Sequence, residues 1–336
     1  MQWQKNESKL SEKLNYRDNS MLNRRHLRVK VLQALYAYYQ SEETDYAKTQ
    51  KGLLDAIERM YDLYIYLFLT FSELRRIAEN RIEESKKKIR PTEQDLHPNR
   101  KFVDNRIFEL IESNRQLRLL SETRKVNWTG DENQEMFRKM FLSIKDDETY
   151  ITYMNDEKDS FENDRQFIID LFKTDIANSP LLYHFFEEKS IHWMDDIDLA
   201  CSMVLKTIKS IEEGNEMELL PLYKKDDDEE EFITTLLRKT ISMDKENEQL
   251  IDELTKNWEL DRIAKMDIIL MKMAITELQV CKSIPTKVTL NEYIEISKFY
   301  STPKSNGFIN GILDKAIELL SNQKKIVKIG RGLLNN

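Results

Sequence analysis

The sequence predicts an all-helical protein, on two observations. Only seven Gly and six Pro occur among 336 residues, while a third of the residues are charged. A chain so poor in turn-forming residues favours helices joined by few tight turns. The second observation is that apolar residues recur along most of the chain at the spacing of one helix face.

The first predicted helix spans residues 24 to 40. Its apolar side chains recur at the spacing i, i+4, i+7, i+8 and i+11, at Leu27, Val31, Ala34, Leu35 and Tyr38. That spacing is typical of an amphipathic helix with one buried stripe. The preceding residues 1 to 20 form a polar extension without the basic, apolar and small-residue succession of a signal peptide.

Several long helices are expected from about residue 41 to 216. Breaks are predicted at the basic, Pro-containing segment 86–100 and at the Asn-Trp-Thr-Gly segment within 125–131. The longest apolar run, residues 61–71, contains Asp62 and is shorter than the roughly 18 to 20 residues of a membrane span. It is interpreted as part of a buried helix, and no membrane contact is expected.

A weak internal repeat appears when the chain is shifted by 65 residues. Chance matches are common between amphipathic helices, but a Trp and an Asp coincide without a gap. A degenerate copy of the C-terminal half is therefore one interpretation of the region around 164–211, and chance is the other. The coinciding residues are Phe167, Leu171, Ile176, Trp193, Asp196 and Leu205 with Phe232, Leu236, Ile241, Trp258, Asp261 and Leu270.

The C-terminal half predicts a helical bundle. Six consecutive acids at 226–231 precede the apolar pattern 232–241, which indicates a solvated helix start. Four further helices are predicted at 247–257, 261–279, 286–300 and 305–321, with Ser305 as a possible N-cap. The segment 262–278 is apolar on nearly every side and is expected to be the central helix.

The charges are distributed unevenly. Residues 21–40 carry four cations and no acid, and the basic tail 322–336 does the same, although the net charge of the chain is −8. An acidic body with two basic ends indicates a small, localised anion site rather than a general nucleic-acid coat.

No catalytic constellation is found, and no enzymatic activity is expected. Phosphate-loop, dinucleotide-binding, zinc-protease and serine-hydrolase motifs are absent, and there are only four His. The two cysteines, Cys201 and Cys281, stand alone, so neither a disulfide framework nor a metal site is expected. No cofactor is implied, and a reducing cytoplasm fits this cysteine usage.

One basic cluster indicates a function. Arg24, Arg25 and Arg28 lie at the start of a predicted helix, where the helix dipole disfavours cations. A phosphate near the helix start would offset that cost, because guanidinium groups and helix N–H groups both bind its oxygens. A solvated helix end and an ion pair with the acidic body are the alternatives.

Five segments of the sequence resemble the NusB family. The cluster stands in an RRHLRVKVLQALY segment that resembles the Arg-rich opening helix of that family. The order and spacing of the family also recur in the C-terminal half. The segments there are Asn257 to Ile263, Met273 to Leu278, Ile284 to Glu292 with its PxKxxxNE-like pattern, and Phe308 to Lys315 with its FxNGxLDK-like pattern.

This resemblance implies an all-α NusB-like fold of two helical subdomains. Residues 21–40 and 228–321 would form that core, with 41–227 as an additional helical insertion. It also implies a cytoplasmic factor of ribosomal RNA transcription that acts in antitermination with the transcription elongation complex. Such a factor binds boxA-type single-stranded RNA together with NusE, a small-subunit ribosomal protein.

Site residues follow from the resemblance position by position. RNA contact would fall on Arg24, Arg25 and Arg28, with Lys287, Lys304 and Phe308 as neighbours, and partner contact on Tyr36, Asp261 and Asp267. Lys304 stands where the family usually has an acid, which adds a cation beside the RNA. Core packing is the alternative role for Phe308 and Tyr36, and a single solvent-facing position is the alternative for Asp267.

The alternatives to this function are a protein-interaction adaptor and an RNA-modifying enzyme. A protein-interaction adaptor would keep the fold and bind no RNA. An RNA-modifying enzyme would resemble the methyltransferases to which NusB-like domains are fused, but it needs an α/β cofactor domain. No strand, Gly-rich loop and helix pattern for such a domain occurs in the sequence.

Overall fold

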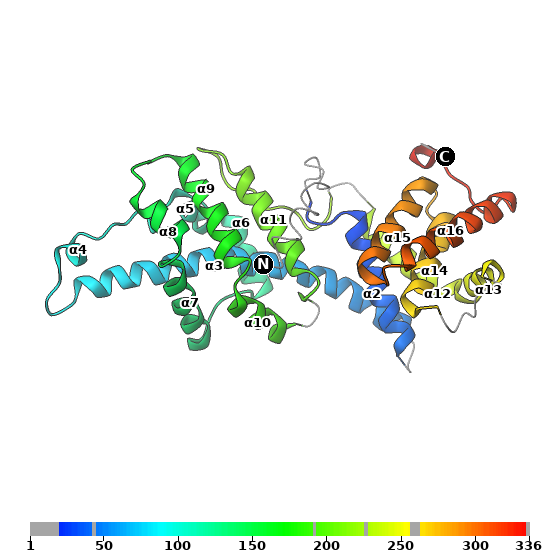
Figure 1. The fold of residues 1–336 in the computed structure, drawn as a ribbon, viewed down its shortest axis with the longest axis horizontal. Coiled ribbons are helices and arrows are strands. Elements are labelled where there is room, and N and C mark those ends of the chain that lie inside the picture. Colours follow the sequence, from blue (N-terminus) through cyan, green and yellow to red (C-terminus); the bar gives the residue numbers. More distant parts are fainter. Residues whose placement is uncertain (1–19, 42–44, 191–192, 225–227, 256–262, 334–336) are drawn as a thin grey trace. The chain divides into compact units, whose positions relative to one another are not determined.

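A computed structural model describes residues 20–41, 45–190, 193–224, 228–255 and 263–333 (Figure 1). These ranges contain helices and connecting loops and no strand, which confirms the all-α prediction. The chain divides into two compact units. The first includes residues 58–222, and the second consists of residues 22–57 and 223–336.

The second unit is a bundle built around one buried helix, α14 (Lys265–Val280). Five helices pack against it, and nearly every side chain from Ile269 to Leu278 is buried, which confirms the prediction of a central helix. The five helices are α2 (Arg24–Gln40), α12 (Glu229–Ser242), α13 (Asp244–Leu254), α15 (Thr286–Tyr300) and α16 (Ser305–Asn322).

Helix α2 has the predicted bounds and buries the predicted stripe. Its side chains Leu27, Val31 and Leu35 are fully buried, and the helix packs against α12, α14 and α15. Asn23 caps the helix by accepting a hydrogen bond from the backbone N–H of His26, and the His26 ring accepts one from the backbone N–H of Asn23. This reciprocal capping box satisfies two backbone donors at the helix start.

Some predicted boundaries of the bundle need correction. Helix α13 spans Asp244–Leu254 rather than 247–257, and α14 begins at Lys265 rather than 261. Ser305 is the first residue of α16 and not its N-cap, and its buried hydroxyl contacts those of Ser301 and Thr302. Residues 256–262 lie outside the described ranges.

The start of α12 was predicted to be solvated, and this holds for only part of its acidic run. Asp228, Glu230 and Glu231 are exposed. Glu229 is buried instead, and one of its carboxylate oxygens accepts a hydrogen bond from the backbone N–H of Lys224. Residues 226 and 227 of the acidic run are not among the described ones.

The first unit has a core of aromatic side chains around helix α3 (Tyr46–Lys86), whose residues from Glu58 onward belong to this unit. The run 61–71 is a largely buried part of α3, as predicted, and α3 ends at Lys86 where the Pro-containing break begins. The second predicted break separates α6 from α7. No helix of the described ranges has the length and apolar character needed to cross a membrane. The other helices of this unit are α4 (Glu93–Leu96), α5 (Arg106–Ser113), α6 (Arg115–Arg124), α7 (Asp131–Ile144), α8 (Glu148–Asn155), α9 (Phe161–Leu171) with the π-helical η2 (Phe172–Ile176), α10 (Pro180–Lys189) and α11 (Ile197–Ser210).

Three helical segments of the first unit fall approximately on helices of the second unit under the 65-residue shift. The shift places α10 on residues 245–254, where α13 spans Asp244–Leu254, and it places α9 with η2 on α12 and α11 on α14. Buried positions also coincide, and Trp258 and Asp261 lie outside the described ranges. The degenerate repeat stays a prediction that these correspondences favour. The buried pairs include Phe167 with Phe232, Ile168 with Ile233, Leu171 with Leu236, Phe186 with Ile251 and Leu205 with Leu270.

Candidate functional site

The three arginines of α2 each form an ion pair with a different segment of the second unit. Arg24 pairs with Asp228, which immediately precedes α12, at 2.7 Å between Nη2 and Oδ1. Arg25 donates two hydrogen bonds of 2.7 Å to Glu292 of α15. Arg28 in turn pairs with Glu277 of α14.

The Arg28 pair lies in the core. Its Nε and Nη2 donate two 2.7 Å hydrogen bonds to Glu277, and the two side chains are 2% and 0% exposed. Glu277 also accepts hydrogen bonds from Thr289 Oγ1 at 2.9 Å and Tyr293 Oη at 3.0 Å. A buried carboxylate with this many donors is fully satisfied.

Both members of this pair are charged. Burial disfavours the charged form of each, but the opposite charge outweighs burial, so the pKa of Arg28 is raised and the pKa of Glu277 is lowered. Arg28 does not face solvent, because its guanidinium is buried. Through Glu277, it joins α2 to α14 and α15.

Arg24 and Arg25 remain partly accessible. Their side chains are 28% and 34% exposed, and Arg24 lies over the ring of Phe232, 4.9 Å from its centroid. The hydrogen bonds to Glu292 raise the pKa of Arg25. An incoming anion would therefore meet two oriented guanidinium groups and would compete with Glu292 and Asp228 for them.

His26 stands between these arginines and is neutral at physiological pH. Burial and the nearby Arg25 lower its pKa to about 4. A nitrogen of its ring accepts a hydrogen bond in the capping box described above. Because the ring stays neutral near pH 7, this hydrogen bond does not change with pH there.

The other predicted RNA neighbours lie on the helices that pack beside α2. Lys287 is exposed in the first turn of α15, and Lys304 is exposed directly before α16. Phe308 is half-buried in the first turn of α16. Helix α15 packs against both α2 and α16, so these residues belong to the same bundle as the arginines.

The predicted partner residues are not all at the surface. Tyr36 is 40% exposed on α2. Asp267 is 4% exposed, and the hydroxyl of Ser301 donates a hydrogen bond to its carboxylate. The alternative that Asp267 faces solvent is therefore wrong. Its role at the start of α14 is to tie the α15–α16 loop to that helix. Asp261 lies outside the described ranges.

The acidic partners of the arginines were missed by sequence reasoning. Glu277 is a lone acid within the apolar segment 269–278, which is a signal for a buried ion pair. Glu292 closes the PxKxxxNE-like pattern, but nothing in its local sequence names Arg25 as its partner. Asp228 is one of six consecutive acids, and the sequence does not distinguish it from the other five.

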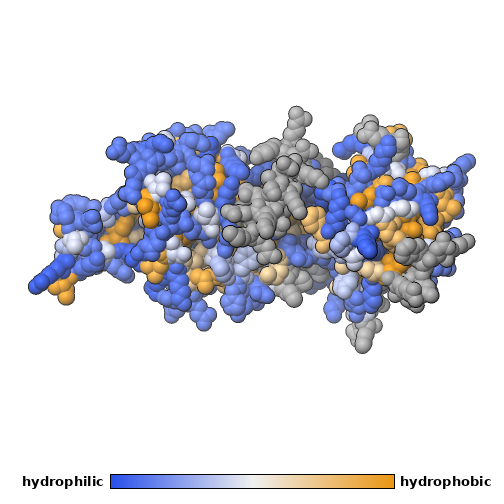
Figure 2. Space-filling view, in the orientation of Figure 1, coloured by the Kyte–Doolittle hydropathy of each residue, from blue (hydrophilic) through white to orange (hydrophobic). Residues whose placement is uncertain are grey.

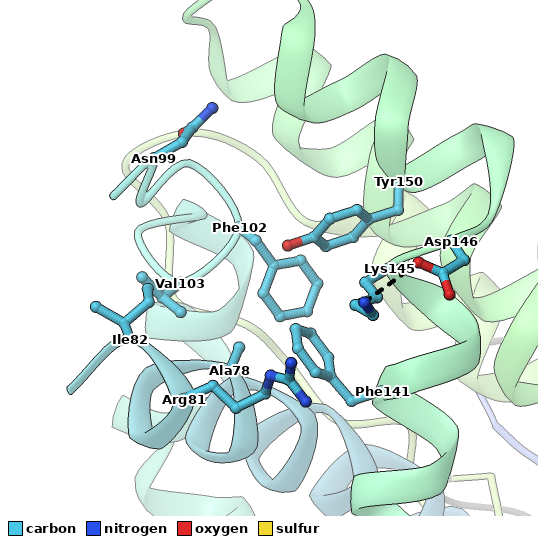
Figure 3. A pocket seen from close by; sticks show the side chains of 10 residues that line it. All are labelled: Ala78, Arg81, Ile82, Asn99, Phe102, Val103, Phe141, Lys145, Asp146 and Tyr150. Carbon is cyan, nitrogen blue, oxygen red and sulfur yellow. Dashed lines mark ion pairs between the residues drawn. The ribbon is translucent and has the colours of Figure 1, made fainter. Parts of the chain in front are cut away.

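The first unit contains a separate recess with a cavity volume of about 310 Å³ (Figure 3). Phe102, Phe141 and Tyr150 point into it, with ring centroids 5.3 to 6.1 Å apart. Arg81 lies at its edge, and Lys145 there is paired with Asp146. Phe102 and Phe141 are at most 5% exposed, so the recess offers little ring surface to a ligand.

Fold and site together define a helical bundle with an Arg-rich helix whose outer guanidinium groups are accessible to anions. The NusB family model matches residues 198–318. This part of the chain is therefore similar to the NusB family, as the sequence motifs predicted. Helix α2 lies outside the matched range, and its packing against α12, α14 and α15 joins it to that part.

Three similar proteins are named transcription antitermination protein NusB. The protein of Salinibacter ruber is 41% identical over 104 residues, which are 31% of this chain and 65% of that protein. The protein of Natranaerobius thermophilus is 36% identical over 91 residues, or 27% and 66%. The protein of Chloroherpeton thalassium is 39% identical over 105 residues, or 31% and 50%.

This chain thus spans between half and two thirds of the length of these relatives. No solved structure gives a significant match to it.

Proposed function

We propose that this protein is a non-enzymatic transcription antitermination factor that binds boxA-type single-stranded RNA together with NusE. The observation that carries the proposal is the placement of α2 on the part of the chain that is similar to the NusB family, with Arg24 and Arg25 accessible and oriented. The names of the relatives support antitermination, and the motif resemblance supports the RNA and the partner.

In the proposed mechanism, RNA phosphates displace carboxylates. A phosphate can accept two hydrogen bonds from Arg25 in the same bidentate geometry as Glu292. Its binding also releases counterions from the RNA, which favours the exchange. Lys287 and Lys304, exposed on the neighbouring helices, add favourable charge. Bases carry the sequence information, because phosphate contacts only fix the position of the strand.

The buried Arg28 has a different role in this proposal. Its pair with Glu277 fixes the rotation of α2 on the bundle, and this rotation directs Arg24 and Arg25 outward. Arg28 is therefore a positioning residue, and direct phosphate contact is left to the other two arginines. NusE would bind next to the exposed Tyr36 on the same helix.

A protein-interaction adaptor is the second candidate, because all three arginines already have acidic partners. A gel-shift titration with boxA-like RNA, with and without NusE, separates the two functions. The antitermination factor shifts the RNA and shifts it at lower concentration with NusE. An adaptor binds NusE, and no RNA shift appears in either series.

A further inference from the structure

Helix α15 presents an exposed aromatic ring in its last turn. Phe299 is 74% exposed, and among the large hydrophobic side chains of the described ranges only Ile89 is more exposed. Single exposed apolar residues are common on protein surfaces. Phe299 is distinguished by its position relative to the arginine site.

Phe299 lies on the helix face that holds Arg25. Val288, Glu292, Glu295 and Phe299 follow one another on α15 at intervals of three or four residues, which places them on one stripe. Glu292 accepts the two hydrogen bonds from Arg25. Phe299 is seven residues further along, or about 10 Å of helix rise, in nearly the same direction around the axis.

Two exposed lysines lie close to Phe299 in the chain. Lys298 precedes it and is exposed, although it pairs with Glu295 at 2.5 Å, and Lys304 is exposed in the loop that follows α15. At the other end of the stripe, Lys287 is exposed beside Val288. Figure 2 shows apolar residues among hydrophilic ones on the visible face of this unit.

A single exposed ring with exposed lysines nearby in the chain fits a nucleic-acid strand better than a protein partner. Protein interfaces have a core of contiguous apolar residues from which charged residues are depleted. Proteins that bind single-stranded nucleic acid combine cations along the backbone with aromatic rings on which bases stack. Because every base has a flat face, such a ring binds without a fixed sequence.

We propose that Phe299 stacks against one unpaired base of the RNA strand whose phosphates Arg25 binds. This inference rests on the proposed RNA binding and adds a named base contact to it. Phe299 lies about 10 Å along α15 from Glu292, the partner of Arg25, so the stacked base is a near neighbour of the phosphate at Arg25.

The test is a cycle of protein and RNA variants with the full chain. Affinity for boxA-like RNA is measured for the parent, for Phe299→Ala and for Phe299→Trp, against the normal RNA and a set of RNAs with one abasic nucleotide each. Phe299→Ala is expected to weaken binding about 5- to 150-fold, and Phe299→Trp is expected to restore it. At one position, removal of the base should weaken RNA binding by the parent. The same abasic RNA should bind Phe299→Ala as tightly as the normal RNA does.

Two controls keep the outcome specific. Leu119→Ala removes a side chain that is 61% exposed in the first unit, and it should leave RNA affinity unchanged. Thermal unfolding of Phe299→Ala should match the parent, since an exposed ring contributes little to the core. NusE affinity without RNA should also be unchanged.

Other results overturn the inference. If the parent binds RNA through Arg24 and Arg25 while Phe299→Ala binds equally well, the stacking contact is absent and the proposed function stands. If Phe299→Ala loses NusE instead, the ring is a protein contact. If the parent binds no RNA, both the inference and the proposed function fail.

Discussion

Arg28 of α2 and Glu277 of α14 form a buried ion pair with two hydrogen bonds of 2.7 Å, although 249 positions separate them in the chain. The pair connects the Arg-rich motif to the apolar central helix. Because Thr289 and Tyr293 donate to the same carboxylate, α15 is fixed by this one acid as well. The relative placement of three helices thus depends on a single satisfied carboxylate.

Arg28→Ala should destabilise the bundle strongly, because it leaves the Glu277 carboxylate buried without its counter-charge. The expected loss is about 3 to 5 kcal/mol of unfolding free energy, measured by urea denaturation. Arg24→Ala is the matched control, and it should cost no more than about 1 kcal/mol since its pair with Asp228 is partly exposed. Equal costs for the two variants would show that the Arg28 pair does not anchor α2.

Glu292→Gln should increase RNA affinity. The substitution removes the carboxylate that competes with phosphate for Arg25, a partly exposed pair worth up to about 1 kcal/mol, so binding should tighten about two- to five-fold. Glu246→Gln makes the same charge change at a different ion pair, the one with Lys325. If both variants tighten binding equally, the effect is one of net charge only.

The sequence was sufficient to predict the helices whose pattern is local. Helix α2 and the buried α14 follow from periodicity, and α2 has its predicted bounds. The start of α13 was placed three residues late, because its first turn is polar and has no apolar period to mark it. Tertiary contacts decide such ends.

The candidate site was only half predictable. The basic cluster was visible in the sequence. However, Arg28 is buried, unlike Arg24 and Arg25, and its burial depends on Glu277 in a helix distant in sequence. Asp267 was likewise expected at the surface and is buried, because the loop after α15 returns to place Ser301 on it. Local periodicity contains no information on such long-range pairs.

The stability of the bundle should fall between pH 6.5 and pH 4 in part through His26. Burial lowers its folded-state pKa to about 4 from the ordinary 6.5, so the unfolded chain binds a proton that the folded chain does not. The associated stability is complete above pH 6.5 and is lost as pH falls toward 4, by on the order of 3 kcal/mol. The difference in unfolding free energy between parent and His26→Gln, measured against pH, gives this contribution.

His26→Gln is informative because Gln at this position keeps a capping box while it removes the titrating group. The variant should have a flatter stability profile below pH 6.5 than the parent. Parallel profiles for the two proteins would mean that His26 is protonated as readily in the folded chain as in the unfolded one.

Tyr36→Ala should weaken NusE binding, because aromatic side chains contribute strongly to interfaces and Tyr36 is exposed on α2. A loss of about tenfold or more is expected by calorimetry, with unchanged thermal unfolding. Asp267→Asn should instead lower the unfolding temperature and leave NusE affinity nearly unchanged, since the carboxylate is buried. The opposite pattern would place the partner at α14.

The salt dependence of RNA binding tests the central claim most directly. Affinity of the full chain for boxA-like RNA is measured from low to moderate salt for the parent and for Arg24→Ala with Arg25→Ala. With two phosphate contacts removed, affinity should fall and the slope of log K against log salt should decrease by about 1.4, while helical content stays the same. An unchanged affinity and slope would contradict the account, because the two accessible arginines of α2 would then be ion pairs of the fold and nothing more.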